Sequence, residues 1–318
     1  MLIEWENVLL AEDDRSVAML RTLGSQISGS EARFEILVVF NPEHVDPPLV
    51  EQVVRAHLVF TGPHRDTPVR FEPIPGSHYY GMRNRGARMA RGTVLLCLDS
   101  DVIPEDGWLE AVINPILTDP DIDVIGGTTY IEPDSLWARA FGAGWIFEPR
   151  NPDESLRSGN LHFWANNVAF RRSFFLASPY RENEQNGETR NADIRFRDSL
   201  RKHGTPVWIA GRARVSHPAP NGFRHFVIRG LGEGRDQSIM WTERGKGRLA
   251  RTFRAIDLGF GRIRRTVRHA FGRRADLRLP VWEIPPVLAI MAAYAALIVA
   301  GAWIQTWLPK RCSMGWRF

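Results

Sequence analysis

The feature that most constrains the fold of this 318-residue sequence is a short apolar run that ends in two acids. Val94 to Leu98 reads Val-Leu-Leu-Cys-Leu, and Asp99-Ser100-Asp101 follows directly. An apolar run of this length, bounded by turn residues, is typical of a strand buried on both faces of a parallel sheet. In open α/β sheets, ligands bind in the crevice beyond the carboxyl ends of such strands. We therefore expect Asp99 and Asp101 to lie at a ligand-binding edge.

Strand-like and helix-like segments alternate along the first two thirds of the chain. Strands are expected at 1–5, 34–40, 69–71, 94–98, from 123, at 163–172 and from 207–209 to 215–217, and helices over 8–27, 51–59, 79–91, 104–117 and 191–203. Such alternation is typical of βαβ units. The sequence therefore predicts an α/β fold that is Rossmann-like, with a mostly parallel sheet flanked by helices.

The C-terminal part contains an uncharged stretch of 25 residues, Ile284 to Leu308. As a helix it would be about 37 Å long, enough to cross a bilayer with some tilt. Trp282, Trp303 and Trp307 lie near its ends, as interfacial aromatic residues do. We expect one transmembrane helix here; the alternative is a buried core helix. Because the basic residues precede it, the positive-inside rule places residues 1 to about 280 in the cytoplasm.

The segment Arg244 to Arg278 holds most of the positive charge. It has twelve Lys or Arg residues and two Asp, a net charge of +10, while the whole chain carries +5. Apolar residues recur among these charges at helical spacing (Leu249, Phe253, Ile256, Phe260, Ile263, Val267 and Phe271). The pattern predicts an amphipathic helix pair on the surface of a membrane, with anionic lipids as partners. RNA would need the same charges, but the adjacent apolar stretch favours lipid, so no nucleic-acid partner is expected.

Asp99 and Asp101 form one of three Asp-x-Asp matches in the chain. The other two, Asp119/Asp121 and Asp121/Asp123, lie in a turn-like sequence, where Asp and Pro are common. Carboxylates at a strand end suit a hard divalent cation, Mn²⁺ or Mg²⁺, that also binds substrate phosphates. The alternative is that the two acids only cap a helix or form a turn.

The surrounding sequence, RNRGARMARGTVLLCLDSDVIPEDGWLEAVI, resembles the core of family 2 glycosyltransferases. The order of its parts carries the resemblance: Asn and Gly in a loop, Ala-x-Gly, an apolar strand, Asp-x-Asp, then Pro-Glu-x-x-Trp-Leu. The resemblance covers residues 1–225 and implies a GT-A fold that binds a nucleotide-diphosphate sugar through a divalent metal. We expect a donor half over 1–127 and an acceptor half over 128–225. A Gly-rich loop and the basic segment would follow over 226–280, and the transmembrane helix (284–308) and a tail over 281–318.

The resemblance also implies roles for single residues. On the donor side these are Glu4, Glu6, Asn41, Arg83, Arg85 and Asp99, with Asp101 as the metal ligand and His217 as a second one. The alternatives are that the arginines are merely exposed on a basic helix and that the histidine is structural. Gly230 to Gln237 is expected to be a loop that closes over the diphosphate through Arg235.

On the acceptor side, Asp193 lies eleven residues before Gly204, where the family has its general base. The usual preceding Glu is replaced by Ala192, and Glu188 is the substitute candidate. The alternative is an acid that interacts with the helix dipole. Trp164, Asn166 and Asn167 are expected to contact the acceptor, although a core Trp is the competing interpretation.

These expectations describe a membrane-anchored, inverting glycosyltransferase that uses a nucleotide sugar, with a UDP-sugar as the expected donor. Its acceptor would be a hydroxyl of a glycan or lipid-linked glycan for cell-envelope or extracellular polysaccharide. Two alternatives stay open: a sugar nucleotidyltransferase, and a non-catalytic membrane-associated partner of a polysaccharide assembly system.

Overall fold

The computed structural model describes residues 1–5, 13–182 and 192–309. The chain divides into two compact units, which are described separately. The sheet unit comprises Met1–Thr129 and Asn151–His217, and the helical unit comprises Tyr130–Arg150 and Pro218–Phe318. These limits differ from the expected boundaries at 225 and 280, because the helix at 136–144 packs against the helices at 248–272 and 284–307.

The sheet unit is built on a nine-stranded sheet in the order β3-β2-β1-β4-β8-β6-β9-β5, with β7 pairing with β9. Four adjacent strands are parallel: β3 (Val69–Pro73), β2 (Ile36–Phe40), β1 (Leu2–Glu4) and β4 (Val94–Asp99). β8 (Asn167–Arg171) is antiparallel to β4 and to β6 (Val124–Ile131). The long β9 (Val207–His217) pairs with the short strands β5 (Ile103–Pro104) and β7 (Leu156–Gly159).

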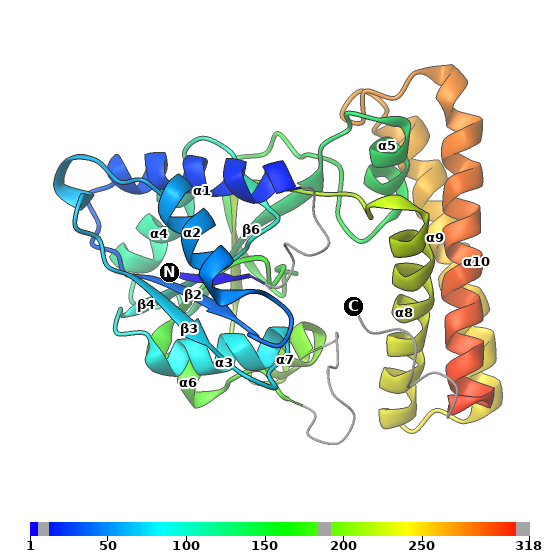
Figure 1. The fold of residues 1–318 in the computed structure, drawn as a ribbon. Coiled ribbons are helices and arrows are strands. Elements are labelled where there is room, and N and C mark those ends of the chain that lie inside the picture. The colour runs from blue at the N-terminus through cyan, green and yellow to red at the C-terminus, as the bar shows by residue number, and fades with distance from the viewer. Residues whose placement is uncertain (6–12, 183–191, 310–318) are drawn as a thin grey trace. The chain divides into compact units, whose positions relative to one another are not determined.

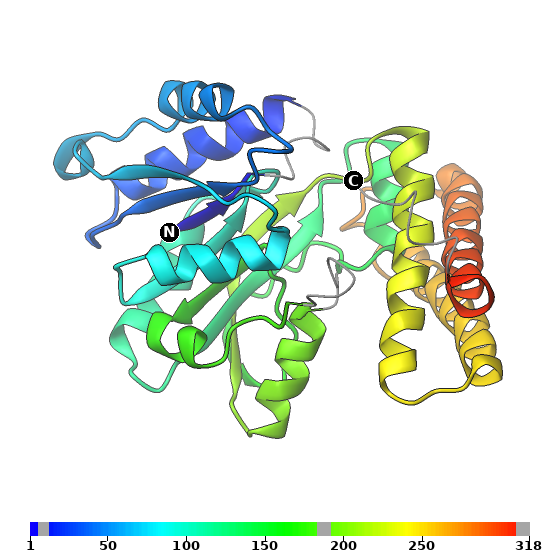
Figure 2. The ribbon, with the colours of Figure 1, turned by 60° about the horizontal axis from the view of Figure 1, so that its bottom comes forward.

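Helices cover both faces of this sheet, so the predicted α/β class is confirmed (Figures 1 and 2). One face carries α1 (Asp13–Ser28), α2 (Pro47–His57) and α4 (Trp108–Thr118), and the other α3 (Tyr79–Met89), α6 (Arg172–Ala177) and α7 (Ala192–Lys202). A short 3₁₀ turn, Gly62–His64, follows α2. Alternate residues of each strand enter the two cores: Leu96 and Leu98 face α1, α2 and α4, while Leu95 and Cys97 face α3, α6 and α7. The apolar run 94–98 is thus a strand buried on both faces.

The helical unit consists of α5 (Leu136–Gly144), α8 (Gly222–Glu243), α9 (Arg248–Gly272) and α10 (Ile284–Trp307), with a 3₁₀ turn, Val281–Glu283, before α10. The expected loop at 230–237 is wrong, since these residues lie inside α8. Its glycines serve helix packing instead. A Cβ on Gly234 would lie 1.9 Å from the carbonyl oxygen of Ile298, and one on Gly301 would lie 2.1 Å from that of Leu231. Small residues here let α8 and α10 touch backbone to backbone, as in helix pairs with small-residue motifs.

The basic segment forms a single 25-residue helix, α9, and not a pair of helices. Side chains of α9 contact the C-terminal end of α5 and the residues just after it. Arg262 donates to the Gly144 carbonyl at 3.1 Å, the His269 ring lies 2.9 Å from the Ala143 carbonyl, and Arg265 donates to the Phe147 carbonyl at 2.7 Å. Carbonyls at a helix end lack partners within the helix, so donors supplied by another helix stabilise the contact. These three side chains are therefore structural.

Candidate active site

The candidate site lies where the strand order reverses. β1 is flanked by β2 on one side and β4 on the other, and Glu4 pairs in register with Asp99. The carboxyl ends of these parallel strands meet at one edge, which is the usual ligand-binding position in open α/β sheets. Glu4 is fully buried there. The last residues of β9 reach the same edge, since Ser216 pairs with Ile103 just beyond Asp101.

Asp99 is held by two side chains from α3. The Tyr79 hydroxyl lies 2.9 Å from each carboxylate oxygen, and the Arg83 guanidinium forms an ion pair with Oδ1. Burial raises the pKa of Asp99 to about 6, although Arg83 acts in the opposite direction. Asp99 therefore sits in a buried, well-ordered polar cluster at the end of β4.

Arg83 differs from the prediction that it contacts the donor. Its side chain is completely buried, donates to the carbonyl of Ala165 as well as to Asp99, and stacks on the Tyr79 ring at 4.4 Å. A guanidinium committed to these partners positions Asp99 and is not presented to a phosphate. Arg85, two residues farther along α3, is exposed and donates to the Pro75 carbonyl at 3.5 Å, so it stays a candidate for the donor.

Asp101 and His217, the two expected metal ligands, lie close together. Asp101 Oδ2 lies 3.7 Å from His217 Nε2, and both side chains are mostly buried. Arg15 on α1 links the two segments, donating to the Asp101 carbonyl at 3.1 Å and the Ser216 carbonyl at 2.9 Å. An octahedral ion with ligands at about 2.1 Å has neighbouring donor atoms about 3 Å apart, so this carboxylate–imidazole pair would have to move closer together to occupy two of its positions. Within residues 1–5, 13–182 and 192–309 there is no group of three or more His, Cys, Asp or Glu arranged to hold a metal. Substrate and water oxygens would have to complete the shell.

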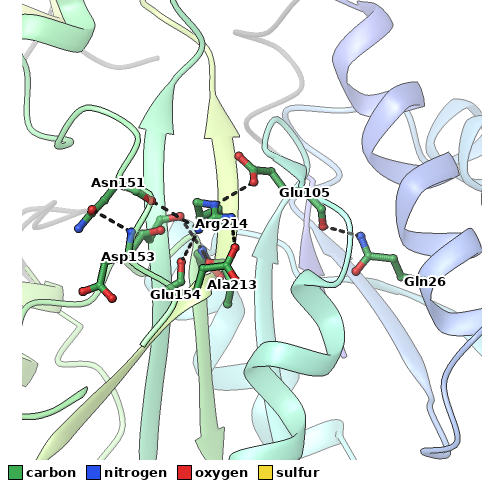
Figure 3. Close-up of polar contacts among 10 residues, drawn as sticks. Gln26, Glu105, Asn151, Asp153, Glu154, Ala213 and Arg214 are labelled. Carbon is green, nitrogen blue, oxygen red and sulfur yellow. Dashed lines mark hydrogen bonds and ion pairs between the residues drawn. The ribbon is translucent and has the colours of Figure 1, made fainter. Parts of the chain in front are cut away.

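A partly buried ion pair that the sequence did not predict stabilises this edge (Figure 3). Arg214 on β9 donates to Glu105 Oε2 at 2.8 Å and to Glu154 Oε1 at 3.1 Å. Glu105 belongs to the Pro-Glu-x-x-Trp-Leu motif, and its carbonyl accepts from Gln26 of α1 at 2.9 Å. The pair lies four residues after Asp101 and three before His217, so it fixes the two strands that carry the candidate metal ligands.

Asp193 lies in the first turn of α7, as predicted. The Tyr80 hydroxyl donates to its carboxylate, and burial raises its pKa to about 6 although this hydrogen bond acts in the opposite direction. Tyr80 follows Tyr79, the residue that binds Asp99. Two consecutive tyrosines of α3 therefore hold the two carboxylates, and sequence reasoning missed both. Glu188 and Glu6 lie outside the described residues.

The residues expected to bind the acceptor differ in burial and in hydrogen bonding. Trp164 is half-buried, with its ring 4.0 Å from that of His162. Asn166 is buried and accepts from the Thr129 hydroxyl at 3.1 Å. Asn167 is completely buried, accepts from the Trp108 indole at 2.9 Å and donates to the Ala213 carbonyl at 3.0 Å. Asn167 therefore ties strands and helix together and does not face an acceptor, which corrects the prediction.

Two remaining donor candidates also have structural partners. Asn41, just beyond β2, is buried, donates to the Ser77 carbonyl at 3.3 Å and accepts from the Glu43 amide at 3.0 Å. It shapes the loop at the strand end. Arg235 belongs to the helical unit, where Nε donates to Asp236 at 2.8 Å within α8. Its contact with a diphosphate stays a prediction, but the loop proposed to carry it is absent.

Comparisons with known proteins found similar structures and a matching family model. A mannosyltransferase from Pyrobaculum calidifontis, in complex with GDP-Man and Mn²⁺, is 16% identical with a TM-score of 0.48, and the match covers 98% of this chain and 81% of that chain. A glucosyl-3-phosphoglycerate synthase from Mycobacterium tuberculosis, in complex with Mn²⁺, UDP-glucose and phosphoglyceric acid, is 14% identical with a TM-score of 0.42, covering 68% and 70%. A comparison with curated protein sequences found no match. The model of glycosyl transferase family 2 matches residues 17–177, half of the chain, and the chain therefore belongs to that family.

Proposed function

We propose that the protein is an inverting glycosyltransferase that moves a sugar from a nucleotide-diphosphate sugar, with UDP as the expected nucleotide, to a hydroxyl acceptor. The observation that carries the proposal is the pair of carboxylates held by consecutive tyrosines. Tyr79 binds Asp99 at the donor edge, and Tyr80 binds Asp193. Family membership supplies the reaction class, and this pair supplies separate acids for donor and acceptor. The acceptor is proposed to be a glycan or lipid-linked glycan for cell-envelope or extracellular polysaccharide.

Different residues have different roles in a single displacement at the anomeric carbon. Asp193 accepts the proton of the acceptor hydroxyl while the new bond forms at the anomeric carbon and the bond to the diphosphate oxygen breaks, which inverts that carbon. Glu4 and Asp99 line the edge where the nucleoside binds. Asp101 and His217 are the residues that would hold a Mn²⁺ or Mg²⁺ ion, and the chemistry that such an ion supplies is neutralisation of the charge on the leaving diphosphate.

The pKa of Asp193 suits this role. A general base works best when its pKa is close to the working pH, because it is then ionised yet still basic. With a pKa of about 6, Asp193 is mostly ionised at pH 7 and is a stronger base than an ordinary Asp. The raised value comes first from burial, and the Tyr80 hydroxyl keeps it from rising further.

The test is transfer by the purified full chain with a panel of nucleotide sugars, with Mn²⁺ and with chelator. We expect turnover with one donor class, its loss in chelator, and a fall of about 10²–10⁴-fold in kcat for Asp193→Asn. Asp198→Asn is the matched control, because Asp198 is exposed on the same helix, and it should keep full activity. Transfer that survives Asp193→Asn would contradict the assigned base. Synthesis of a nucleotide sugar from a sugar phosphate would instead support a nucleotidyltransferase, and no reaction with any donor would support a non-catalytic partner.

Membrane attachment is part of the proposal. Val281–Trp307 is long and apolar enough to cross a bilayer, and 39% of its most apolar window is buried. We place the sheet unit on the cytoplasmic side and anionic lipids among the partners, since the cytoplasmic leaflet carries the anionic lipids that attract a basic segment. The length and composition of residues 284–308, taken alone, favour a helix that crosses the bilayer. Fractionation of cells that express the full chain tests the attachment; recovery wholly in the soluble fraction would contradict it.

A further inference from the structure

Helices α9 and α10 of the helical unit are antiparallel and lie side by side along most of their length (Figures 1 and 2). Near the end of α10, the Trp303 indole donates to the Thr252 carbonyl near the start of α9, at 3.2 Å. Farther along, a Cβ on Gly259 of α9 would lie 2.8 Å from the Val299 side chain of α10. Both helices are about 36 Å long or slightly more. Wherever α10 lies, α9 therefore lies beside it.

This packing is incompatible with α10 crossing a bilayer in the observed arrangement. α9 would then cross as well, and it carries exposed Arg254, Arg264 and Arg268 in its central and later turns. Charged side chains exposed to the hydrocarbon core are strongly unfavourable. The interior of the unit also contains a polar cluster, in which Tyr294 of α10 donates to Glu233 of α8 at 3.1 Å and Arg262 of α9 pairs with the same carboxylate.

The same two helices expose a shared apolar face. On α9 the exposed apolar residues are Leu249, Phe253, Phe260, Val267 and Phe271, and the three phenylalanines are 64–68% exposed. On α10 the exposed residues are Pro285, Ala289, Ala292, Ala293, Ala296, Trp303 and Trp307. Successive residues of a helix are rotated by about 100° around its axis. On each helix, the exposed apolar side is therefore rotated by roughly 60–90° from the side that contacts the other helix. Because the helices are antiparallel, these rotations point to the same side. The two sets therefore form one continuous surface, which we call the α9/α10 face.

Charge indicates what covers this face. Arg264, Arg268 and Arg254 follow the apolar stripe around α9, so one edge of the face is positive. An apolar strip bordered by arginines is typical of helices that lie in the plane of an anionic membrane surface. A second copy of the chain on this face would bring arginines of like charge together. The charge pattern thus favours lipid over self-association.

We propose that the α9/α10 face lies flat in an anionic membrane surface, and that α10 does not cross the membrane. The inference rests on the membrane attachment in the proposed function and specifies its geometry. It has a topological consequence: the C-terminus remains on the same side of the membrane as the sheet unit. The sheet unit is then attached to the surface at which a lipid-linked acceptor would be found.

Vesicle binding by the full chain tests the face. We expect sedimentation with vesicles of phosphatidylcholine mixed with phosphatidylglycerol, weaker binding to phosphatidylcholine alone, and weakening by salt. The double substitution Phe253→Glu and Phe260→Glu should abolish binding, and each Arg→Gln change at 254, 264 or 268 should weaken it about fivefold. Leu117→Glu is the matched control, since Leu117 is an exposed apolar residue of α4 in the sheet unit. Unchanged binding by the double variant would overturn the proposal, as would a wild-type dimer that the double variant converts to monomer.

Topology provides the second measurement. An epitope at the C-terminus of the full chain should be digested by protease added to the cytoplasmic face of sealed membranes, together with the sheet unit. An epitope protected on that face and digested from the opposite face would show a crossing and overturn the proposal. Neither measurement needs enzymatic activity, so its failure is distinguishable from failure of the proposed transfer reaction.

Discussion

The raised pKa of Asp193 makes the pH dependence of activity the sharpest test of the assigned base. Burial raises this pKa from 3.8 to about 6, so the folded protein holds the proton more tightly than an ordinary Asp does. The base is active only when ionised, and activity should therefore fall as the pH drops through about 6. With that pKa roughly 90% of the carboxylate is ionised at pH 7 and roughly 10% at pH 5, which predicts about a ninefold fall in kcat/KM. An ordinary Asp would lose less than about a tenth of its activity over the same range.

Two tyrosine substitutions test whether ionisation of Asp193 is what causes the fall in activity at low pH. Tyr80→Phe removes the hydrogen bond that favours the ionised carboxylate, so the pKa of Asp193 should rise further. A hydrogen bond to a charged group contributes about 1.5–3 kcal/mol, which corresponds to a shift of the acid limb by about one to two pH units. Tyr180→Phe is the matched control, because its ring lies 4.9 Å from that of Tyr80 and its buried hydroxyl has no hydrogen-bond partner among the described residues. The assay is kcat/KM measured from pH 4.5 to pH 8 at saturating Mn²⁺. An acid limb near pH 4, or equal shifts in the two variants, would refute the reasoning.

The same pKa predicts an effect on stability. Because the folded-state value lies above the unfolded one, ionising Asp193 costs stability above about pH 6, and that cost disappears as the pH falls toward 3.8. Its upper limit is about 3 kcal/mol. Asp193→Asn should therefore inactivate the enzyme while raising the denaturation midpoint at pH 7.5. A lower midpoint would show that the carboxylate stabilises the fold instead.

Three further substitutions test the metal edge and the helical unit. Asp101→Ala should lower kcat/KM by more than about 10²-fold at fixed Mn²⁺, and full activity in chelator would contradict the metal role. Glu105→Gln breaks the partly buried ion pair with Arg214 and should lower the free energy of unfolding by roughly 1–3 kcal/mol in denaturant titrations. Glu154→Gln, at a more exposed position, should cost less than about 1 kcal/mol. Gly234→Leu should destabilise the helical unit by about 3 kcal/mol or more in thermal unfolding, because its Cβ would overlap a carbonyl oxygen of α10. Gly261→Ala, on α9 with open space around it, should be neutral or slightly stabilising.

The sequence was sufficient to predict the strands that form the candidate site. The run 94–98 is buried on both faces, so it carries no polar residue until the chain reaches the strand end, and that abrupt change to Asp99 is visible without a structure. Asp101 and His217 could be paired only through the family resemblance. Their approach depends on the alignment of β5 with β9, which no local pattern encodes.

Hydrogen bonds and ion pairs between residues far apart in the sequence could not be predicted from the sequence. Arg83 lies in an Asn/Gly/Arg stretch, which favours contact with phosphate, yet its partners are a carboxylate 16 residues away and a carbonyl 82 residues away. Asn167 likewise follows an aromatic segment typical of a binding surface, but its amide spans two strands and a helix. Tyr79 and Tyr80 begin a helix whose apolar face predicts core packing, and their roles follow only from what lies opposite them. A side chain's type limits which bonds it can make, and the tertiary fold decides which it does make.

The uncharged C-terminal helix is compatible with two topologies, a crossing of the membrane and attachment in its plane. A helix that is apolar all round is usually taken as a membrane span, because a helix at a protein surface keeps one polar stripe for water. α10 has no side facing water if it lies between α8 and α9 on its inner side and lipid on its outer side, so it needs no such stripe. α9 does have a side facing water, and it keeps Arg254, Arg264 and Arg268 there. In-plane attachment therefore accounts for both helices: α10 is apolar all round because it contacts only protein and lipid, and α9 is amphipathic because one of its sides faces water. A single crossing would explain α10 but would leave the exposed phenylalanines of α9, and their position beside its arginines, without a cause.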